Sequence, residues 1–113
     1  GFILGAALAA RLNAGFVMAR KPGKLPAETI EETYAKEYGT DCIQIHKDAI
    51  DENDVVLLHD DLLATGGTMA ACYRLIQKCN PKDAFINFII ELKDLNGRNA
   101  FSDGVEVKTL LEL

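Results

Sequence analysis

The stretch Val56-Leu57-Leu58-His59-Asp60-Asp61-Leu62-Leu63-Ala64-Thr65-Gly66-Gly67-Thr68 decides the fold of this chain. Its first part belongs to a run of β-type apolar residues, Val55 to Leu58, which is typical of a strand buried on both faces of a parallel sheet. Two adjacent carboxylates end that strand, and a loop of small residues follows them. Thr68 is predicted to be the N-cap of a helix that runs to about Cys79.

The segments on either side of this stretch complete an α/β pattern. An apolar run over 84–90 predicts the next strand, so strand, loop, helix and strand form a βαβ unit with a right-handed crossover. A last strand is expected over 105–111, an earlier one over 42–46 and a short buried one over 16–19. Residues 2–12, rich in Ala and Leu, predict a helix. The fold class is therefore α/β, with a parallel sheet flanked by helices.

The segment Arg20 to Gly39 stands apart from the rest of the chain. It carries prolines, glycines and many charges, and its apolar residues show little periodicity. A loop of this length inside a compact domain is usually functional. We therefore expect a lid that is mobile without ligand and closes when a site fills.

Composition and charge narrow the possible functions. With 113 residues, of which 49% are apolar, the chain is expected to form one ordered domain over residues 1–113. Its net charge of −5 repels phosphate backbones, so nucleic-acid binding is disfavoured. The apolar opening stretch 1–19 is interrupted by Arg11 and Asn13, so neither a signal peptide nor a membrane span is predicted. The three cysteines form no C-x-x-C pair and indicate a reduced, cytoplasmic protein.

Residues 60–68 combine a pattern for phosphate with a pattern for a diol. Ligands of open α/β sheets bind at the carboxyl ends of strands, and a helix start offers free N–H groups and a positive dipole end. The glycine pair lets the backbone wrap an anion, and at least one of the two glycines is expected to have a positive φ. Thr65 and Thr68 add hydroxyl donors. The pair Asp60-Asp61 can accept hydrogen bonds from ligand hydroxyls. The predicted ligand class is a ribose 5-phosphate.

Each half of this pattern is weak when taken alone. A Gly-Gly pair before a helix is usually a turn, and an Asp-Asp pair is usually a solvated loop or cap; their spacing after a buried strand favours function. The competing phosphate loops G-x-x-x-x-G-K-[ST] and G-x-G-x-x-G are absent from the sequence. By themselves, Arg20, Lys21 and Lys24 are typical of a solvated surface cluster, and Glu37 of a surface carboxylate.

Residues 56–68 resemble the 5-phosphoribosyl-1-pyrophosphate signature of the type I phosphoribosyltransferases. Their variant, Asp-Asp-Leu-Leu-Ala-Thr-Gly-Gly-Thr, is similar to that of the adenine-specific members. Three further segments resemble the family in family order: its Gly-Phe helix start at 1–5, its basic stretch at 20–26 and the end of its mobile loop at 37–39. In the family, a strand, an arginine and a small N-terminal hood precede the Gly-Phe start, so these parts are expected to be absent from this chain.

The resemblance implies the type I phosphoribosyltransferase fold, a Rossmann-like parallel sheet flanked by helices. It places a mobile loop over about 20–39 and a phosphoribosyl-pyrophosphate loop over 56–68. It implies a purine-salvage reaction in which adenine and phosphoribosyl pyrophosphate give AMP and pyrophosphate. The family uses Mg²⁺, which it gathers mainly through substrate oxygens and water, so no dedicated metal cage is expected. A homodimer is expected as well.

The same resemblance implies a role for each matching residue. Asp60 and Asp61 would hold the ribose hydroxyls, and Ala64 to Thr68 would cradle the 5′-phosphate. Glu37 would exchange a proton with the purine, and Tyr38 would help the loop to close. The residues implied to meet the pyrophosphate charge, also from a partner subunit, are Arg20, Lys21 and Lys24.

Two other functions stay open at this stage. One is a phosphoribosyltransferase for another purine, such as xanthine. The other is a regulatory relative that senses phosphoribosyl pyrophosphate, although the pI of about 4.9 and the retained Glu37-Tyr38 argue against it. Glu91 and Leu92 fit either a base pocket or a structural role at the sheet. His59, where the family usually has an aliphatic residue, is expected to be a core histidine with one partner.

Overall fold

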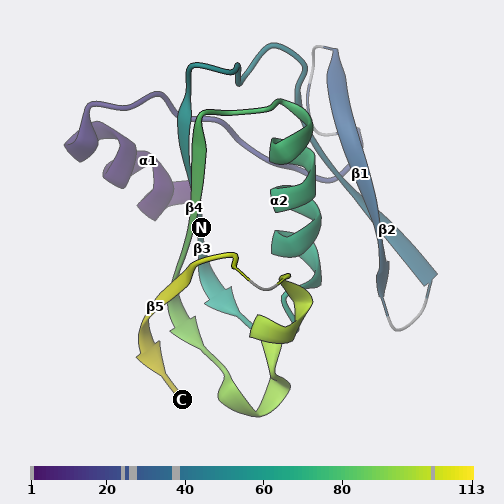
Figure 1. The fold of residues 1–113 in the computed structure, drawn as a ribbon, viewed down its shortest axis with the longest axis vertical. Coiled ribbons are helices and arrows are strands. Elements are labelled where there is room, and N and C mark those ends of the chain that lie inside the picture. The colour runs from purple at the N-terminus through teal and green to yellow at the C-terminus, as the bar shows by residue number, and fades with distance from the viewer. Residues whose placement is uncertain (1, 24, 26–27, 37–38, 103) are drawn as a thin grey trace. The chain divides into compact units, whose positions relative to one another are not determined.

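The computed structural model describes residues 2–23, 25, 28–36, 39–102 and 104–113 (Figure 1). Its elements are, in chain order, α1 (Phe2–Leu12), β1 (Thr29–Lys36), β2 (Gly39–His46), β3 (Val55–Leu63), α2 (Gly67–Lys78), β4 (Asp83–Glu91), the 3₁₀ turns η1 (Lys93–Leu95) and η2 (Gly97–Ala100), and β5 (Val107–Glu112). The chain divides into two compact units. We call them the sheet unit (Gly1–Met18, Leu57–Gly66, Phe85–Leu113) and the hairpin unit (Ala19–Val56, Gly67–Ala84). No helix among the described residues is long and apolar enough to cross a membrane.

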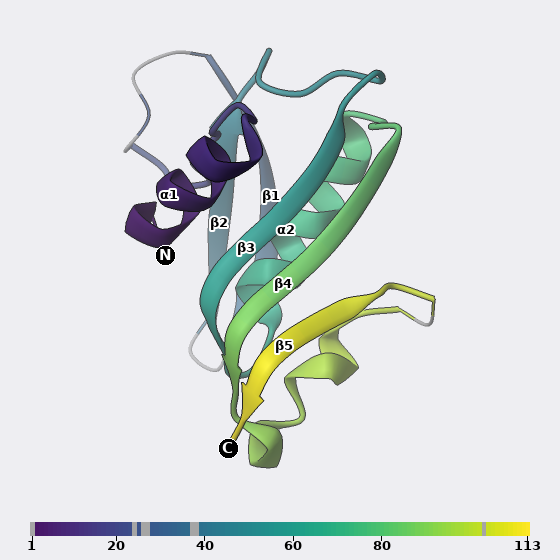
Figure 2. The same ribbon diagram turned by 90° about the vertical axis from the view of Figure 1, so that its left-hand side faces the viewer.

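The sheet unit is built on a three-stranded sheet in the order β3-β4-β5, whose strands run in the same direction (Figure 2). β4 and β5 pair in parallel, with Ile86 opposite Val107. Ile86 and Phe88 alternate along β4 and are almost fully buried, because every second side chain of a strand faces the same way. Leu58 and Leu63 of β3 are buried as well. The predicted α/β class with a parallel sheet is confirmed.

Strand β3 differs from its prediction in two respects. Val55 is 59% and Leu57 43% exposed, so the expectation of a strand buried on both faces is wrong. The strand also continues through Asp60 and Asp61 to Leu63, so the carboxylates lie within the strand and not after it. It extends that far because the Leu63 carbonyl accepts a hydrogen bond, at 3.0 Å, from the first backbone N–H after β4.

The opening segment of the sheet unit is only partly as predicted. The helix expected over 2–12 is found as α1. The short buried strand expected over 16–19 is not formed, and Phe16, Val17 and Met18 are between 37% and 45% exposed. None of the described strands pairs with this apolar run, and a strand needs a partner for its backbone groups.

The hairpin unit consists of the antiparallel pair β1-β2 and helix α2, which packs against both strands. The strand expected over 42–46 is confirmed as part of β2, where Ile43 and Ile45 are buried. The helix expected from 68 to 79 is confirmed to within one residue. It begins at Gly67, however, so Thr68 lies in the first turn and is not the N-cap. The buried side chains of α2 are Ala70, Ala71, Leu75 and Ile76.

Strand β1 corrects the expectation of a loop without regular structure over 20–39. Residues 29–36 form a strand in which Ile30, Glu32 and Tyr34 are half-buried, whereas the side chains between them are exposed. The inward face of β1 is not purely apolar, because Glu32 and Tyr34 share it with Ile30. The inward carboxylate is tolerated because two basic side chains of α2 pair with it.

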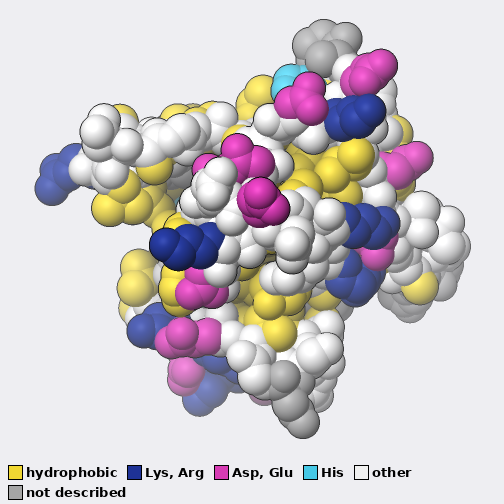
Figure 3. Space-filling view, turned by 45° about the horizontal axis from the view of Figure 1, so that its top comes forward, with side chains coloured by type: hydrophobic (Ala, Val, Ile, Leu, Met, Phe, Trp, Pro, Cys, Tyr) yellow, Lys and Arg dark blue, Asp and Glu magenta, His cyan; other side chains and the backbone are white. Residues whose placement is uncertain are grey.

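Two further features are the mixture of charges on one face of the molecule and the state of the three cysteines. Acidic and basic side chains are interspersed on the face that Figure 3 shows. The three cysteines are free thiols, as expected. Burial raises the pKa of the Cys42 thiol to about 11, so this side chain stays protonated at neutral pH and its Sγ donates to Glu31 Oε2.

Candidate active site

The aspartate pair predicted to hold hydroxyl groups lies near the end of β3 in the sheet unit. Asp60 is half-buried and Asp61 is exposed. The backbone N–H of Asp61 donates to Oδ1 of Asp60 over 2.9 Å. Burial raises the pKa of Asp60, whereas the hydrogen bond with Asp60 lowers the pKa of Asp61. Asp61 therefore holds its negative charge more strongly and offers an acceptor to a hydroxyl-bearing ligand.

The glycines of the predicted phosphate loop have different reasons for being glycine. Gly66 adopts φ +85°, which confirms that at least one of the pair has a positive φ. A Cβ on Gly66 would lie 2.4 Å from the carbonyl oxygen of Gly97, and a Cβ on Gly97 would lie 2.3 Å from the carbonyl oxygen of Ala64. The loop and the segment after β4 thus cross backbone to backbone. Gly67 has no positive φ, and a Cβ there would only touch Tyr34, at 3.8 Å.

The start of α2 is joined to strand β1 within the hairpin unit. Thr68 is exposed, and its hydroxyl donates to the Tyr34 hydroxyl over 3.0 Å. Ala64, Thr65 and Gly66 belong to the sheet unit and continue into Gly67 by a peptide bond. The helix start supplies unpaired N–H groups and the positive end of the helix dipole, as an anion site requires.

Of the basic residues predicted to meet pyrophosphate, two are described. Arg20 is tied to β2, because its backbone N–H and carbonyl exchange hydrogen bonds of 2.9 and 2.7 Å with Gln44. Lys21 is 66% exposed, and its Nζ lies 3.3 Å from Asp41 Oδ2. Both belong to the hairpin unit. The other residues predicted to act near the lid, Lys24, Glu37 and Tyr38, lie outside the described residues.

Glu91, which the sequence left open between two roles, has a structural one. Its carboxylate is buried at 5% exposure, and both of its oxygens accept from Arg98 Nε, at 3.0 and 2.9 Å. Thr109 Oγ1 donates to the same carboxylate over 3.1 Å, and Arg98 Nη1 donates to the Val107 carbonyl. This cluster fastens β5 and the turn η2 to the end of β4. Leu92 contributes the backbone N–H that holds the end of β3.

Sequence reasoning missed three residues that hold these segments in place. Tyr34 of the hairpin unit and Gly97 of the sheet unit meet partners distant in the chain, whereas Arg98 of the sheet unit binds Glu91, seven residues before it. The Gly97-Arg98 pair just after an apolar strand was the one available signal, because a glycine there indicates a close backbone approach.

His59 has the one partner that was expected, but its side chain is half-buried, so it is not the core residue predicted. Its Nδ1 lies 2.9 Å from Oδ1 of Asn87 on β4, which assigns the donor role to Nδ1. Nε2 is buried and has no hydrogen-bond partner among the described residues. The side chain also lies 4.0 Å from the point where a Cβ on Gly5 would stand, so it packs against α1.

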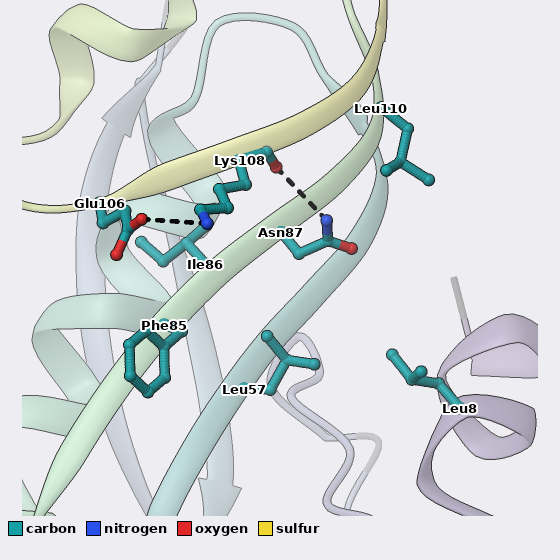
Figure 4. Close-up of a pocket in the computed structure, with 8 residues that line it drawn as sticks. All are labelled: Leu8, Leu57, Phe85, Ile86, Asn87, Glu106, Lys108 and Leu110. Atoms are coloured by element: carbon teal, nitrogen blue, oxygen red, sulfur yellow. Dashed lines mark hydrogen bonds and ion pairs between the residues drawn. The ribbon is translucent and has the colours of Figure 1, made fainter. Parts of the chain in front are cut away.

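A cavity of about 360 Å³ lies in the sheet unit (Figure 4). Its lining residues are Leu8, Leu57, Phe85, Ile86, Asn87, Glu106, Lys108 and Leu110. The lining is mostly apolar, and its polar members bond to one another: Glu106 pairs with Lys108 at 3.3 Å, and Asn87 Nδ2 donates to the Lys108 carbonyl. No predicted site residue contributes to this cavity.

Metal ligands could come from the carboxylate, imidazole and thiolate side chains of the described residues. No group of three or more His, Cys, Asp or Glu within that part of the chain is placed to hold a metal ion. The carboxylates of Asp60 and Asp61 are nevertheless hard oxygen donors of the kind that Mg²⁺ prefers.

Comparisons with known proteins agree with this geometry. A family model described as the phosphoribosyl transferase domain matches residues 1–98. The curated adenine phosphoribosyltransferase of Phocaeicola vulgatus is 79% identical over 113 residues, which are 100% of this chain and 65% of that relative.

Two solved structures are similar across almost the whole chain. The crystal structure of adenine phosphoribosyltransferase from Rhodothermus marinus has a TM-score of 0.95 at 50% identity and covers 99% of this chain and 64% of that one. The structure of Saccharomyces cerevisiae adenine phosphoribosyltransferase, complexed with D-2,5-dideoxy-2,5-imino-altritol 1,6-bisphosphate and adenine, has a TM-score of 0.89 at 42% identity. The match covers 97% of this chain and 61% of the yeast chain. The chain thus spans somewhat less than two thirds of the length of these relatives. Because the family model covers most of its residues, the chain belongs to the phosphoribosyltransferase family.

Proposed function

We propose that this chain carries the phosphoribosyl-pyrophosphate site of an adenine phosphoribosyltransferase. The reaction transfers the phosphoribosyl group of 5-phosphoribosyl-1-pyrophosphate to adenine and yields AMP and pyrophosphate. The observation that supports it best is the run from Asp60 to Thr68, in which a carboxylate pair precedes a left-handed Gly66 and the start of α2. The 79% identity to an adenine phosphoribosyltransferase supports adenine as the base.

In this proposal the run 60–68 holds the ribose 5-phosphate part of the substrate. Asp60 and Asp61 accept hydrogen bonds from the ribose hydroxyls. Ala64 to Thr68 cradle the 5′-phosphate with backbone N–H groups and two threonine hydroxyls. Glycosyl transfer passes through an oxocarbenium-like centre. The reaction is therefore faster when the substrate is held in the correct orientation and water is excluded from the site.

The lid residues act on the leaving group, pyrophosphate, and on the entering group, the purine. Arg20, Lys21 and Lys24 neutralise the departing pyrophosphate, in the same or the partner subunit. The Lys21 side chain is 66% exposed, so its ammonium group can reach a pyrophosphate, although it lies 3.3 Å from the half-buried carboxylate of Asp41. Glu37 exchanges a proton with the purine, and Tyr38 helps the lid to close.

Mg²⁺ fits this site as a substrate-bound ion. Pyrophosphate oxygens, ribose hydroxyls and water would supply most of its ligands, and the carboxylates of Asp60 and Asp61 would hold the hydroxyls nearby. When bound, the ion neutralises charge on the pyrophosphate. We also propose a cytoplasmic homodimer that binds neither nucleic acid nor membrane. The free cysteines support the cytoplasmic location, and the net charge of −5 supports the lack of nucleic-acid binding.

Steady-state kinetics of the full-length protein tests the proposed function. Adenine, hypoxanthine, guanine and xanthine are each supplied with phosphoribosyl pyrophosphate and Mg²⁺, and nucleotide formation is measured. We expect AMP formation with a kcat/KM far above that for the other bases. Turnover of another purine alone would establish a different phosphoribosyltransferase, and binding of phosphoribosyl pyrophosphate without turnover would indicate a sensor.

The aspartate pair offers a direct test of substrate binding. Asp61→Asn removes a charged acceptor, whose hydrogen bond contributes about 1.5–3 kcal/mol. We expect phosphoribosyl pyrophosphate binding or turnover to weaken by roughly 10–100-fold, with the fold intact. Calorimetric titration measures the affinity, and Asp48→Asn, an exposed turn residue, serves as the matched control. Unchanged affinity together with unchanged turnover would remove Asp61 from the site.

A further inference from the structure

Tyr34 occupies a position at the phosphate loop that the proposed function leaves unused. Its hydroxyl lies 3.0 Å from Oγ1 of Thr68, in the first turn of α2. Its ring lies against Gly67, since Cδ2 is 3.8 Å from the point where a Cβ would stand there. Tyr34, Gly67 and Thr68 all belong to the hairpin unit, so these contacts lie within one compact body.

The hydroxyl pair can change its direction of donation. A threonine hydroxyl has one proton to donate and can accept two hydrogen bonds, and a tyrosine hydroxyl can also both donate and accept. In this structure Thr68 donates to Tyr34. When an anion at the helix start accepts a hydrogen bond from the Thr68 hydroxyl, the Tyr34 hydroxyl can rotate and donate to Thr68 Oγ1 instead of accepting from it. The hydrogen bond between the two hydroxyls is then kept, and it holds the Thr68 hydroxyl directed at the anion.

The strand that carries Tyr34 is anchored to α2 at a second place. Glu32 lies two residues earlier on the same face of β1, and its carboxylate accepts from Lys78 Nζ at 2.7 Å and from Arg74 Nε at 3.2 Å. Hydrogen bonding to Lys78 lowers the pKa of Glu32, so the carboxylate is charged at neutral pH. This second attachment holds Tyr34 beside the helix start before any ligand arrives, as preorganisation requires.

We propose that Tyr34 is a positioning residue for the 5′-phosphate, acting through Thr68 by reversal of their hydrogen bond. The inference rests on the proposed function, because it assumes that the anion at the start of α2 is the phosphate of a nucleotide. The proposal adds a residue of strand β1, which belongs to the segment expected to form the lid, to the phosphate site. It also connects that site to the strand that leads directly to Glu37.

Binding measurements on the full-length protein test this role. Kd for AMP is measured by calorimetric titration, and KM for adenine by steady-state kinetics, for wild type, Tyr34→Phe, Thr68→Val and the double variant. Phenylalanine keeps the ring on Gly67 and removes only the hydroxyl. We expect Tyr34→Phe to raise Kd for AMP by about 3–10-fold, the range of one neutral hydrogen bond, and to leave KM for adenine unchanged.

The double variant separates a relay from two independent contacts. If Tyr34 acts only through Thr68, AMP affinity of the double variant equals that of Thr68→Val alone. Thr68→Ser, which keeps the hydroxyl, is expected to retain near wild-type affinity. Tyr73→Phe, the same change on α2, is the matched control and should change neither constant.

Several outcomes would overturn the role of Tyr34. Wild-type AMP affinity in Tyr34→Phe, equal losses for AMP and adenine, or multiplying effects in the double variant would each do so. In these cases the wild-type protein still makes AMP, and the proposed function stands. A wild-type protein that binds neither AMP nor phosphoribosyl pyrophosphate would remove the proposed function and the Tyr34 role together.

Discussion

Replacing Glu37 with glutamine should lower kcat for AMP formation by about 10²–10⁴-fold, the usual contribution of a general acid or base. Glutamine keeps the shape of the side chain but cannot exchange a proton with the purine. Affinity for phosphoribosyl pyrophosphate should change little, because we propose that Asp60, Asp61 and the loop to Thr68 hold that ligand. kcat and affinity are therefore measured on the same variant, under conditions where chemistry limits the rate.

A second glutamate provides the control for Glu37. Glu28→Gln makes the same chemical change just before β1, where the carboxylate is 86% exposed and pairs only loosely with Lys47, at 3.8 Å. It should leave kcat at the wild-type value. If Glu37→Gln also turned over at the wild-type rate, Glu37 would have no part in the proton transfer and the segment would act only as a lid.

Gly66→Ala should destabilise the protein by about 2–5 kcal/mol. The left-handed backbone at φ +85° costs a residue with a Cβ roughly 1–2 kcal/mol, and overpacking adds roughly 1–3 kcal/mol. The overpacking arises because the new Cβ would lie 2.4 Å from the Gly97 carbonyl oxygen and 3.0 Å from the Ala100 Cβ. A backbone oxygen cannot turn aside as the end of a side chain can, so the loop or η2 must move.

Chemical denaturation of the full-length protein measures this loss, and Gly104→Ala isolates its steric part. Gly104 has nearly the same φ, +89°, but a Cβ there would meet nothing within 4 Å. It should therefore lose only the backbone term, about 1–2 kcal/mol. Equal losses for the two variants would show that the crossing of Gly66 with Gly97 adds no constraint. AMP affinity should fall only in Gly66→Ala, since only that variant displaces the loop.

The sequence by itself determined the elements whose signals are local. The apolar run before Asp60, the small-residue loop and the amphipathic segment after it predicted β3, the loop and α2 in the right order, and the apolar run that follows predicted β4. The need for a positive φ at the glycine pair was equally readable, and it is met at Gly66. These features depend on residues a few positions apart, because strand period, helix period and turn conformation are properties of short segments.

Only the tertiary structure decided the features that depend on distant partners. The sequence of β1 shows no apolar alternation, because Glu32 lies on the inner face of the strand. The partners of Glu32, Arg74 and Lys78, lie 42 and 46 residues further along the chain. Tyr34 likewise meets Thr68 across 34 residues. A buried or half-buried polar group is stable only with its partner in place, and a sequence pattern does not show which partner folding brings. The strand β1 and the hydroxyl pair at the phosphate loop therefore follow from packing and not from local sequence.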